Sequence, residues 1–309
     1  MVENFHGHGI RCPMTIFDPD NPEHILQLCA LALTAGRNAM RHYAADVAVD
    51  AKADNSPVTI ADLEGEEILT KGIEQHFDKI QIIGEEAASL ALPDHIENRF
   101  FLLDALDGTR EFINKRTDFT VNIGFIENGQ PEAGVIYAPA LGDLYFTGKS
   151  GAFLLSVSPD DPMIDDFAML GAAMEKAEKL TPRTPDSDAG MIVIASRSHR
   201  APETDSYLET MQVQELVSAG SSLKFCLVAR GKADIYPRHG RTMEWDTAAG
   251  HAILRAAGGR VEDLDSNMLG YGKLERGWII RILSPSGVSL KELPPRRLVG
   301  IKNAFLQRH

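Results

Sequence analysis

Two acidic residues directly after an apolar run have types and spacing suited to metal chemistry. Asp104 and Asp107 lie three residues apart and follow the run 100–103. Mg²⁺ prefers carboxylate and carbonyl oxygens in octahedral geometry, so two acids flanking a tight turn can provide ligands to two neighbouring ions. Gly108 lets the backbone approach a phosphate oxygen, and Thr109 places a hydroxyl beside it. The stretch indicates metal-assisted phosphate chemistry.

Further acids occur in two other stretches of the chain. Glu85 and Glu86 follow the isoleucine-rich run 79–83, and Asp246 lies at the expected start of a helix. Because three or more like charges rarely gather without a cation, their convergence on the first pair predicts a metal site. Each group also has an ordinary structural explanation when taken alone. The aspartate pair fits a turn, Asp246 fits a helix N-cap, and the two glutamates fit a solvated surface.

The elements that must position these acids follow from the hydrophobic pattern. Helices are expected over 23–43 and 60–77, where apolar residues recur at helical spacing. Thr59 and Asp62 resemble a capping arrangement at the start of the second helix. The apolar runs before the acids are expected to be buried strands whose ends deliver the carboxylates. Alternating segments within 119–146, interrupted by turn signals, indicate antiparallel strands.

The second half of the chain alternates strands and helices as an α/β lobe does. We expect strands over 191–195, 215–219 and 233–236, and helices over 203–211, 223–229 and 247–257. Residues 157–189 are expected to be a loop-rich insertion with a short helix around 167–179. The sequence therefore predicts a protein of mixed α+β and α/β class with two intimately packed lobes. The N-terminal metal-binding lobe would span 1–156 and the C-terminal substrate lobe 190–309.

Composition limits the class of protein. The chain has 309 residues, 44% hydrophobic and 24% charged, as an ordinary globular protein does. Its formal net charge of −13 argues against binding polymeric nucleic acid, which needs clustered Lys and Arg. A small anionic substrate remains open, because metal ions reverse the local potential of an acidic pocket. The sequence shows no apolar signal segment and no membrane span, and its three cysteines follow no recognisable spacing pattern. We therefore expect a cytoplasmic protein, with peripheral association with the inner membrane as the alternative.

Three blocks of the sequence resemble the signatures of the lithium-sensitive inositol monophosphatase superfamily. They are, in order and rough separation, Gly84–Glu86, Asp104–Thr109 and Trp245–Gly250. Within that superfamily, five further stretches resemble the bacterial bisphosphate nucleotidases of sulfate assimilation, namely 54–59, 110–113, 196–199, 220–226 and 244–251. The resemblance runs from about Leu28 to Gly259 but fails over the insertion. It implies a layered αβαβα sandwich.

The resemblance also implies a role for each matching residue. It implies that two to three Mg²⁺ ions are held by Glu85, Asp104, Asp107, Asp246 and the backbone carbonyl of Leu106. It implies a catalytic group of Asp62 and Thr109, which orient and deprotonate the attacking water, with Glu86 beside the metal ligands. It implies that the substrate contacts Gly108, Thr109, Ser196, His199, Ser221, Lys224 and Arg238. Lys224 and Arg238 suit a second, non-reacting phosphate. Alternatively, Ser221 and Ser222 cap the helix that follows them, and His199 is a solvated loop histidine.

The implied activity is Mg²⁺-dependent hydrolysis of the 3′-phosphate of adenosine 3′,5′-bisphosphate, with 3′-phosphoadenosine 5′-phosphosulfate as a further candidate substrate. Water attacks the phosphate directly, without a covalent phosphoenzyme. An inositol monophosphatase or a sugar-bisphosphatase of the same fold stays open as an alternative. A non-catalytic protein that binds a phosphorylated ligand is a third reading, against which Asp62 and Thr109 argue. The expected partner is a small nucleotide, and the chain is expected to be a monomer or homodimer.

Overall fold

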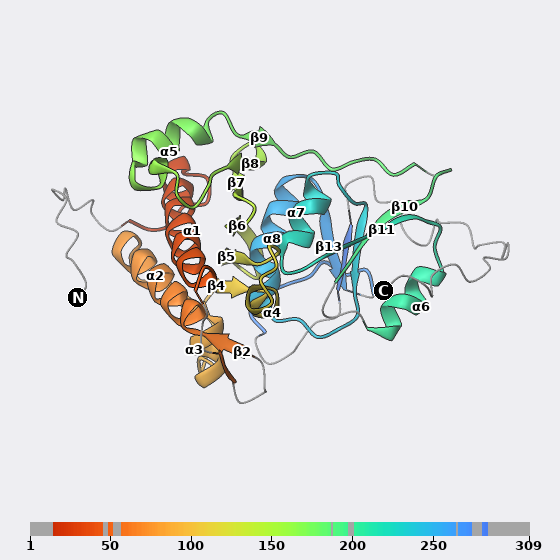
Figure 1. Ribbon diagram of the computed structural model, residues 1–309, viewed down its shortest axis with the longest axis horizontal. Coiled ribbons are helices and arrows are strands. Elements are labelled where there is room, and N and C mark those ends of the chain that lie inside the picture. Colours follow the sequence, from red (N-terminus) through yellow and green to blue (C-terminus); the bar gives the residue numbers. More distant parts are fainter. Residues whose placement is uncertain are drawn as a thin grey trace.

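The computed structural model describes residues 15–45, 49–51, 57–186, 188–196, 201–263, 265–273 and 280–283. Helices and two sheets alternate in layers, which run from left to right in Figure 1. The layers are the helices α1 (Pro22–Tyr43) and α2 (Ile60–His76), a seven-stranded sheet, the helices α7 (Leu223–Ala229) and α8 (Glu244–Ala256), a five-stranded sheet, and α6 (Pro202–Glu209). This is the αβαβα sandwich that the resemblance implied.

The two outer helices begin with the local signals expected of them. Pro22 is the first residue of α1, where its missing N–H costs nothing, and the Asn21 side chain accepts a hydrogen bond from the Glu23 N–H. Helix α2 begins with a capping box between Thr59 and Asp62 and follows a hairpin of β1 (Val49–Ala51) and β2 (Pro57–Thr59). Both helices and the cap were predicted from the sequence.

The seven-stranded sheet explains why two of the acid-bearing stretches meet. Its strands, in spatial order, are β3 (Gln81–Gly84), β4 (Arg99–Asp107), β5 (Thr120–Glu127), β6 (Gln130–Ala138), β7 (Asp143–Gly148), β8 (Gly151–Ser156) and β9 (Glu178–Lys179). Strands β3 and β4 are parallel, and all later neighbours are antiparallel. The carboxyl ends of β3 and β4 therefore lie at the same edge of the sheet.

Strand β4 extends farther than the sequence indicated. The expected strand ended at Leu103, whereas β4 continues to Asp107. Asp104 pairs with Asn122 and Asp107 with Thr120, so the ladder contains an irregularity between the two acids. The acids thus lie on a distorted strand end, and the chain turns only at Gly108, whose φ of 93° is favourable for glycine.

The five-stranded sheet carries the second half of the chain. Its strands, in spatial order, are β11 (Val213–Ala219), β10 (Met191–Ser196), β12 (Ile235–Arg238), β14 (Ile280–Leu283) and β13 (Arg260–Asp263). The strands and helices expected between 191 and 236 are all present, whereas β13 and β14 were not predicted from the sequence. Helix α8 begins at Glu244, three residues before the expected start at 247.

The segment 157–189 packs on the outer helical layer. It contains the 3₁₀ turn η1 (Pro162–Asp165), α5 (Phe167–Met174) and β9, so the expected helix around 167–179 ends five residues early. Arg37 of α1 donates to the carbonyl of Pro159 and to the Asp165 carboxylate. The boundaries of the two lobes remain a prediction. Within the described residues, no helix has the length and apolar character needed to cross a membrane.

Candidate active site

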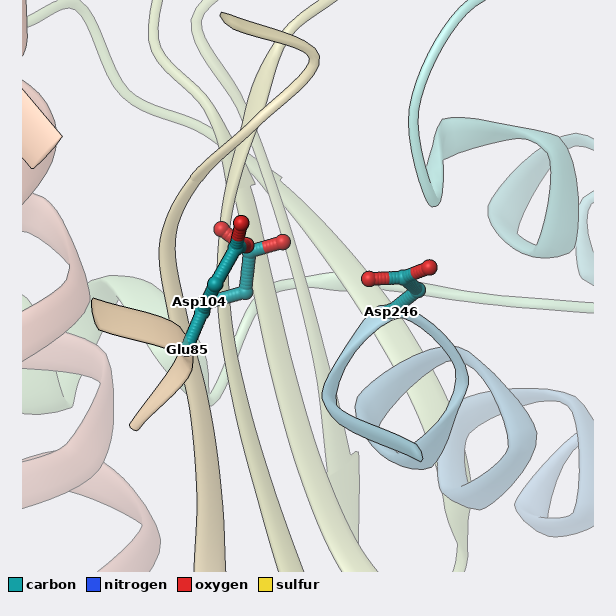
Figure 2. A group of neighbouring side chains, drawn as sticks. All are labelled: Glu85, Asp104 and Asp246. Carbon is teal, nitrogen blue, oxygen red and sulfur yellow. The ribbon is translucent and has the colours of Figure 1, made fainter. Parts of the chain in front are cut away.

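Three carboxylates from three elements meet at the edge where β3 and β4 end. Glu85 is the first residue of α3 (Glu85–Leu90), Asp104 lies in β4, and Asp246 lies in the first turn of α8. One oxygen of each carboxylate lies within 4.8 Å of the others. Figure 2 shows Glu85 beside Asp104 and Asp246 facing them from its helix. The structure thus brings together acids that are up to 161 residues apart in the sequence.

Glu85 is positioned by a buried glutamate that no pattern in the sequence indicated. The carboxylate of Glu66 accepts hydrogen bonds from the backbone N–H groups of Glu86 at 2.7 Å and Ala87 at 2.9 Å. It therefore caps the N-terminus of α3. A Cβ at Gly84 would overlap the Glu66 carboxyl group, so a side chain there would displace this carboxylate from the N-terminus of α3.

The other two carboxylates are each fixed through one oxygen. Oδ1 of Asp104, a side chain only 3% exposed, accepts the Leu106 N–H at 3.0 Å. Oδ2 of Asp246 accepts the Met243 N–H at 3.0 Å and the Thr242 hydroxyl at 2.8 Å. Asp246 is therefore not the N-cap residue that its alternative explanation proposed, because Met243 is the N-cap of α8 and Asp246, three residues later, bonds back to the Met243 N–H. The same side chain also joins the acid cluster.

Burial and mutual repulsion make this cluster costly to ionise. Burial raises the pKa of Asp104 well above its usual value, and the charges of Glu85, Asp107 and Asp246 add to the effect. Burial and the Asp246 charge also raise the pKa of Asp107 to about 6, although Lys224 and Arg238 oppose the shift. Because all the donors are oxygens, this set fits a hard divalent cation such as Mg²⁺. A bound cation would relieve the repulsion.

Asp107 and the Leu106 carbonyl belong to the same pocket. Leu106, Asp107, Gly108 and Thr109 line it together with the three clustered acids. Oδ2 of Asp107 accepts the backbone N–H of Ser222, whereas the Leu106 carbonyl lies 3.3 Å from the Thr109 hydroxyl. The consecutive residues predicted to bind metal and phosphate therefore all face one cavity.

A hydrogen-bonded pair lies at the side of this pocket. Thr109, the first residue of α4 (Thr109–Ile113), donates its hydroxyl to Oδ1 of Asp62 at 3.1 Å. Oδ2 of Asp62 accepts both the backbone N–H of Thr59 at 2.7 Å and its hydroxyl at 2.6 Å. Asp62 is only 4% exposed, so the carboxylate is fixed between two threonines. Such a pair can orient a water and take its proton.

The described members of the predicted substrate group in the second half of the chain belong to the same pocket. Ser196, Ser221, Lys224 and Arg238 all line it. The Lys224 ammonium contacts the Ser221 carbonyl and lies 5.2 Å from the Tyr236 ring centre. Arg238 donates to the Tyr236 hydroxyl at 3.2 Å and to the Arg241 carbonyl at 2.9 Å. Both cations are thus held close to the metal acids.

Three predicted residues are not placed in the lining of the pocket, and one of them is Asp62, which contacts the pocket through Thr109. Glu86 lines a separate surface groove with Leu63 and Leu90, on another face of α3. His199 lies outside the described residues, as do residues 54–56 of the resembling stretch. Arg110, which directly follows Thr109, also lines the pocket, a role that no pattern in the sequence indicated.

Comparisons with known proteins agree with this geometry. The family model described as the inositol monophosphatase family matches residues 21–286. The 3′(2′),5′-bisphosphate nucleotidase CysQ of Escherichia coli O157:H7 is 38% identical over 248 residues, which cover 79% of this chain and 92% of that protein. The CysQ of Buchnera aphidicola subsp. Acyrthosiphon pisum is 39% identical, covering 81% and 88%. The crystal structure of CysQ from Bacteroides thetaiotaomicron superposes with a TM-score of 0.71 at 35% identity, covering 85% and 98%.

Proposed function

Because the chain belongs to the inositol monophosphatase family, we propose that it hydrolyses the 3′-phosphate of adenosine 3′,5′-bisphosphate, giving AMP and phosphate. The observation that carries the proposal is the meeting of Glu85, Asp104 and Asp246 beside the Thr109–Asp62 pair. Hydrolysis of a phosphate monoester requires neutralisation of the phosphate charge and activation of a water. The acid cluster with its cations would serve the first purpose and the Thr109–Asp62 pair the second.

The metal ligands of the proposal are Glu85, Asp104, Asp107, Asp246 and the carbonyl of Leu106, holding two to three Mg²⁺ ions. Bound Mg²⁺ supplies charge neutralisation at the phosphate and lowers the pKa of a coordinated water. The acids come from β4, α3 and α8, elements fixed by the two sheets and by the Glu66 cap. Rigid elements keep such ligands within the narrow geometry that Mg²⁺ requires.

The proton of the attacking water passes to the Thr109–Asp62 pair. The Thr109 hydroxyl donates its own hydrogen to Asp62, so its oxygen can accept a hydrogen bond from the water. Thr59 holds Asp62 in the orientation that this relay needs. Glu86 enters the proposal only through its backbone N–H, which fastens α3 to Glu66, because its side chain lines a different groove.

The substrate class is supported by the cations of the pocket. Arg110, Lys224 and Arg238 all line it, although the chain as a whole is acidic. A bisphosphate presents a second phosphate for which such cations are suited, whereas an inositol monophosphate does not. Relatives at 38% and 39% identity are named 3′(2′),5′-bisphosphate nucleotidases, which favours the same substrate here. The proposal includes 3′-phosphoadenosine 5′-phosphosulfate as a second substrate of the same site.

A substrate panel tests the proposal. Phosphate release is measured with Mg²⁺ on adenosine 3′,5′-bisphosphate, inositol 1-phosphate and fructose 1,6-bisphosphate. The expected result is the highest kcat/KM on the nucleotide and loss of its hydrolysis when Asp107 is replaced by asparagine. A higher kcat/KM on inositol 1-phosphate or fructose 1,6-bisphosphate would show that the proposed substrate is wrong. Full activity of Asp107→Asn would overturn the metal mechanism.

The resemblance supplies the remaining parts of the proposal. We place the enzyme in sulfate assimilation in the cytoplasm, as a monomer or homodimer acting on a small nucleotide. Size-exclusion chromatography with light scattering distinguishes the two oligomeric states.

A further inference from the structure

The carboxylate of Asp107 is held by residues to which no role has yet been given. Its Oδ2 accepts the backbone N–H of Ser222, and the side-chain amide nitrogen of Asn122 lies 3.5 Å from the same oxygen. The Ser222 hydroxyl in turn lies 2.7 Å from the Asn122 side-chain oxygen. Ser222 and Asn122 thus contact each other and also the same oxygen of Asp107.

Chemistry fixes the direction of every hydrogen bond in this group. The Asn122 side-chain oxygen only accepts, so the Ser222 hydroxyl must donate its single proton to it. The Thr120 hydroxyl, 2.8 Å from the Ser222 oxygen, must therefore be the donor of that contact. The chain of donors runs from Thr120 through Ser222 and Asn122 to Asp107. The network ends at the Asp107 carboxylate, which in its ionised form only accepts hydrogen bonds.

Water cannot replace the members of this network. Thr120 and Asn122 have no exposed surface, and Ser222 is 2% exposed. A buried donor or acceptor that loses its partner keeps its desolvation cost, so the network has one favourable arrangement. Within the described part of the chain no hydrogen bond reaches Oδ1 of Asp107, whereas Oδ2 is engaged. The network therefore decides which oxygen a cation can use.

The loop that carries Ser222 comes from the other side of the molecule. Residues 220–222 connect β11 of the five-stranded sheet to α7, whereas Asn122 and Asp107 belong to the seven-stranded sheet. The Gly220 N–H donates to Asp118 at 2.5 Å, and a Cβ at Gly220 would lie 2.8 Å from the Asp118 carbonyl oxygen. Close docking of this loop is thus what brings the Ser222 N–H to Asp107.

We propose that Ser222 and Asn122 are positioning residues for the cation site, because they fix Asp107 with Oδ2 held by the protein and Oδ1 directed to the metal. The inference rests on the proposed function, since it takes Asp107 as a metal ligand. Loop 220–222 then joins the predicted substrate group, through Ser221, to the metal site, through Ser222. Outer partners of metal ligands typically contribute about 10- to 100-fold to metal affinity.

Direct metal binding tests this inference without substrate. Mg²⁺ binding to the full chain is measured by isothermal titration calorimetry for the wild type, Ser222→Ala and Asn122→Asp. We expect affinity to fall about 10-fold for Ser222→Ala and about 100-fold for Asn122→Asp, which replaces an amide donor by a repelling carboxylate. Thermal unfolding of each variant verifies that it is folded.

Thr147→Val provides a matched control. Thr147 is also a buried hydroxyl, bonded to the Gly134 backbone, but it lies on β7, three strands from β4. Its loss should lower stability and leave Mg²⁺ affinity unchanged. Unchanged Mg²⁺ affinity in folded Ser222→Ala and Asn122→Asp, or an equal loss in Thr147→Val, would overturn the inference.

Enzyme kinetics give a second readout. A positioning role predicts that excess Mg²⁺ restores the kcat of Ser222→Ala towards the wild-type value, whereas a general loss of structure would not respond to the metal. If the wild type binds Mg²⁺ and the variants bind it more weakly, the inference holds even when no bisphosphate is hydrolysed. In that case only the assignment of the substrate is wrong.

Discussion

The hydroxyl of Thr109 donates a 3.1 Å hydrogen bond to Oδ1 of Asp62, which lies 47 residues earlier in the chain. Oδ2 of the same carboxylate is held by the N–H and the hydroxyl of Thr59. The base and the hydroxyl that would hand it a proton are therefore fixed relative to each other before any substrate binds. Preorganisation of this kind favours the transition state, because no reorganisation is needed during the reaction.

Replacing Asp62 by asparagine should remove the base and keep the shape of the site. We expect kcat to fall by roughly 10²- to 10⁴-fold, the usual contribution of a general base, with little change in Mg²⁺ affinity. Steady-state kinetics and calorimetric Mg²⁺ titration measure the two effects. Asp94→Asn, at an exposed position outside the pocket, is the matched control. A kcat within threefold of wild type would show that Asp62 does not take the proton.

Arg110 differs from the other two cations of the pocket because its side chain makes no hydrogen bond or ion pair within the described residues. It is exposed, whereas Lys224 and Arg238 are held by neighbouring groups. Arg110→Ala should raise the KM for adenosine 3′,5′-bisphosphate about 3- to 10-fold, since an exposed ion pair contributes little more than about 1 kcal/mol. The KM for adenosine 3′-monophosphate should change less.

The exposed Arg116, which does not line the pocket, provides the control for that substitution. Arg116→Ala should leave the ratio of the two KM values at its wild-type level. Equal effects of Arg110→Ala on both nucleotides would mean that Arg110 does not recognise the second phosphate.

Substitution of Gly220 tests whether the loop 220–222 packs closely against the seven-stranded sheet. A Cβ there would meet the Asp118 carbonyl oxygen and its side chain at 2.8 Å, so Gly220→Ala forces a shift of the backbone. Overpacking of this kind typically costs about 1–3 kcal/mol, which corresponds to a fall in Tm of roughly 1.5–5 °C in a chain of this size. At Gly270 the nearest atom would be 3.7 Å away, so Gly270→Ala should have little effect. Equal Tm values for the two variants would contradict the docking.

The sequence was sufficient to predict those elements whose structure is fixed by a local pattern. Helical periodicity and the Thr59 cap predicted α1 and α2, and the apolar runs before Gly84 and Asp104 predicted two buried strands. A parallel pair of strands then necessarily brings Glu85 to Asp104. These parts of the site follow from short-range rules and the pairing of adjacent strands.

The remaining parts depend on contacts between distant residues. Ser222 and Asp107 are 115 residues apart, and no local signal indicates that the N–H of one holds the carboxylate of the other. In the sequence, Glu66 is an ordinary residue of a helix, and only the fold brings its carboxylate to the N-terminus of α3. Glu86 shows the converse: adjacency to Glu85 indicated a shared site, but successive residues of a helix face different directions, and its side chain lines another groove.

Proton and metal binding should compete at the acid cluster. Burial and the Asp246 charge raise the pKa of Asp107 to about 6, above its value in the unfolded chain. The folded protein without metal therefore holds this proton more tightly than the unfolded chain does, and its stability falls as pH rises towards 6. Mg²⁺ displaces the proton, so the stabilisation that it provides should increase over the same range.

Differential scanning calorimetry at pH 5 and pH 7.5, with Mg²⁺ or with EDTA, measures this linkage. At pH 7.5 and a Mg²⁺ concentration of about 100 Kd, binding contributes about 2.7 kcal/mol, or roughly 4 °C in Tm for a chain of this size. At pH 5 the gain should be smaller, because protons occupy the site. Effects of pH on other groups cancel in the difference between the Mg²⁺ and EDTA scans. An equal gain at both pH values would show that the cation does not bind at these carboxylates, whereas Asp107→Asn should lose most of the gain at pH 7.5.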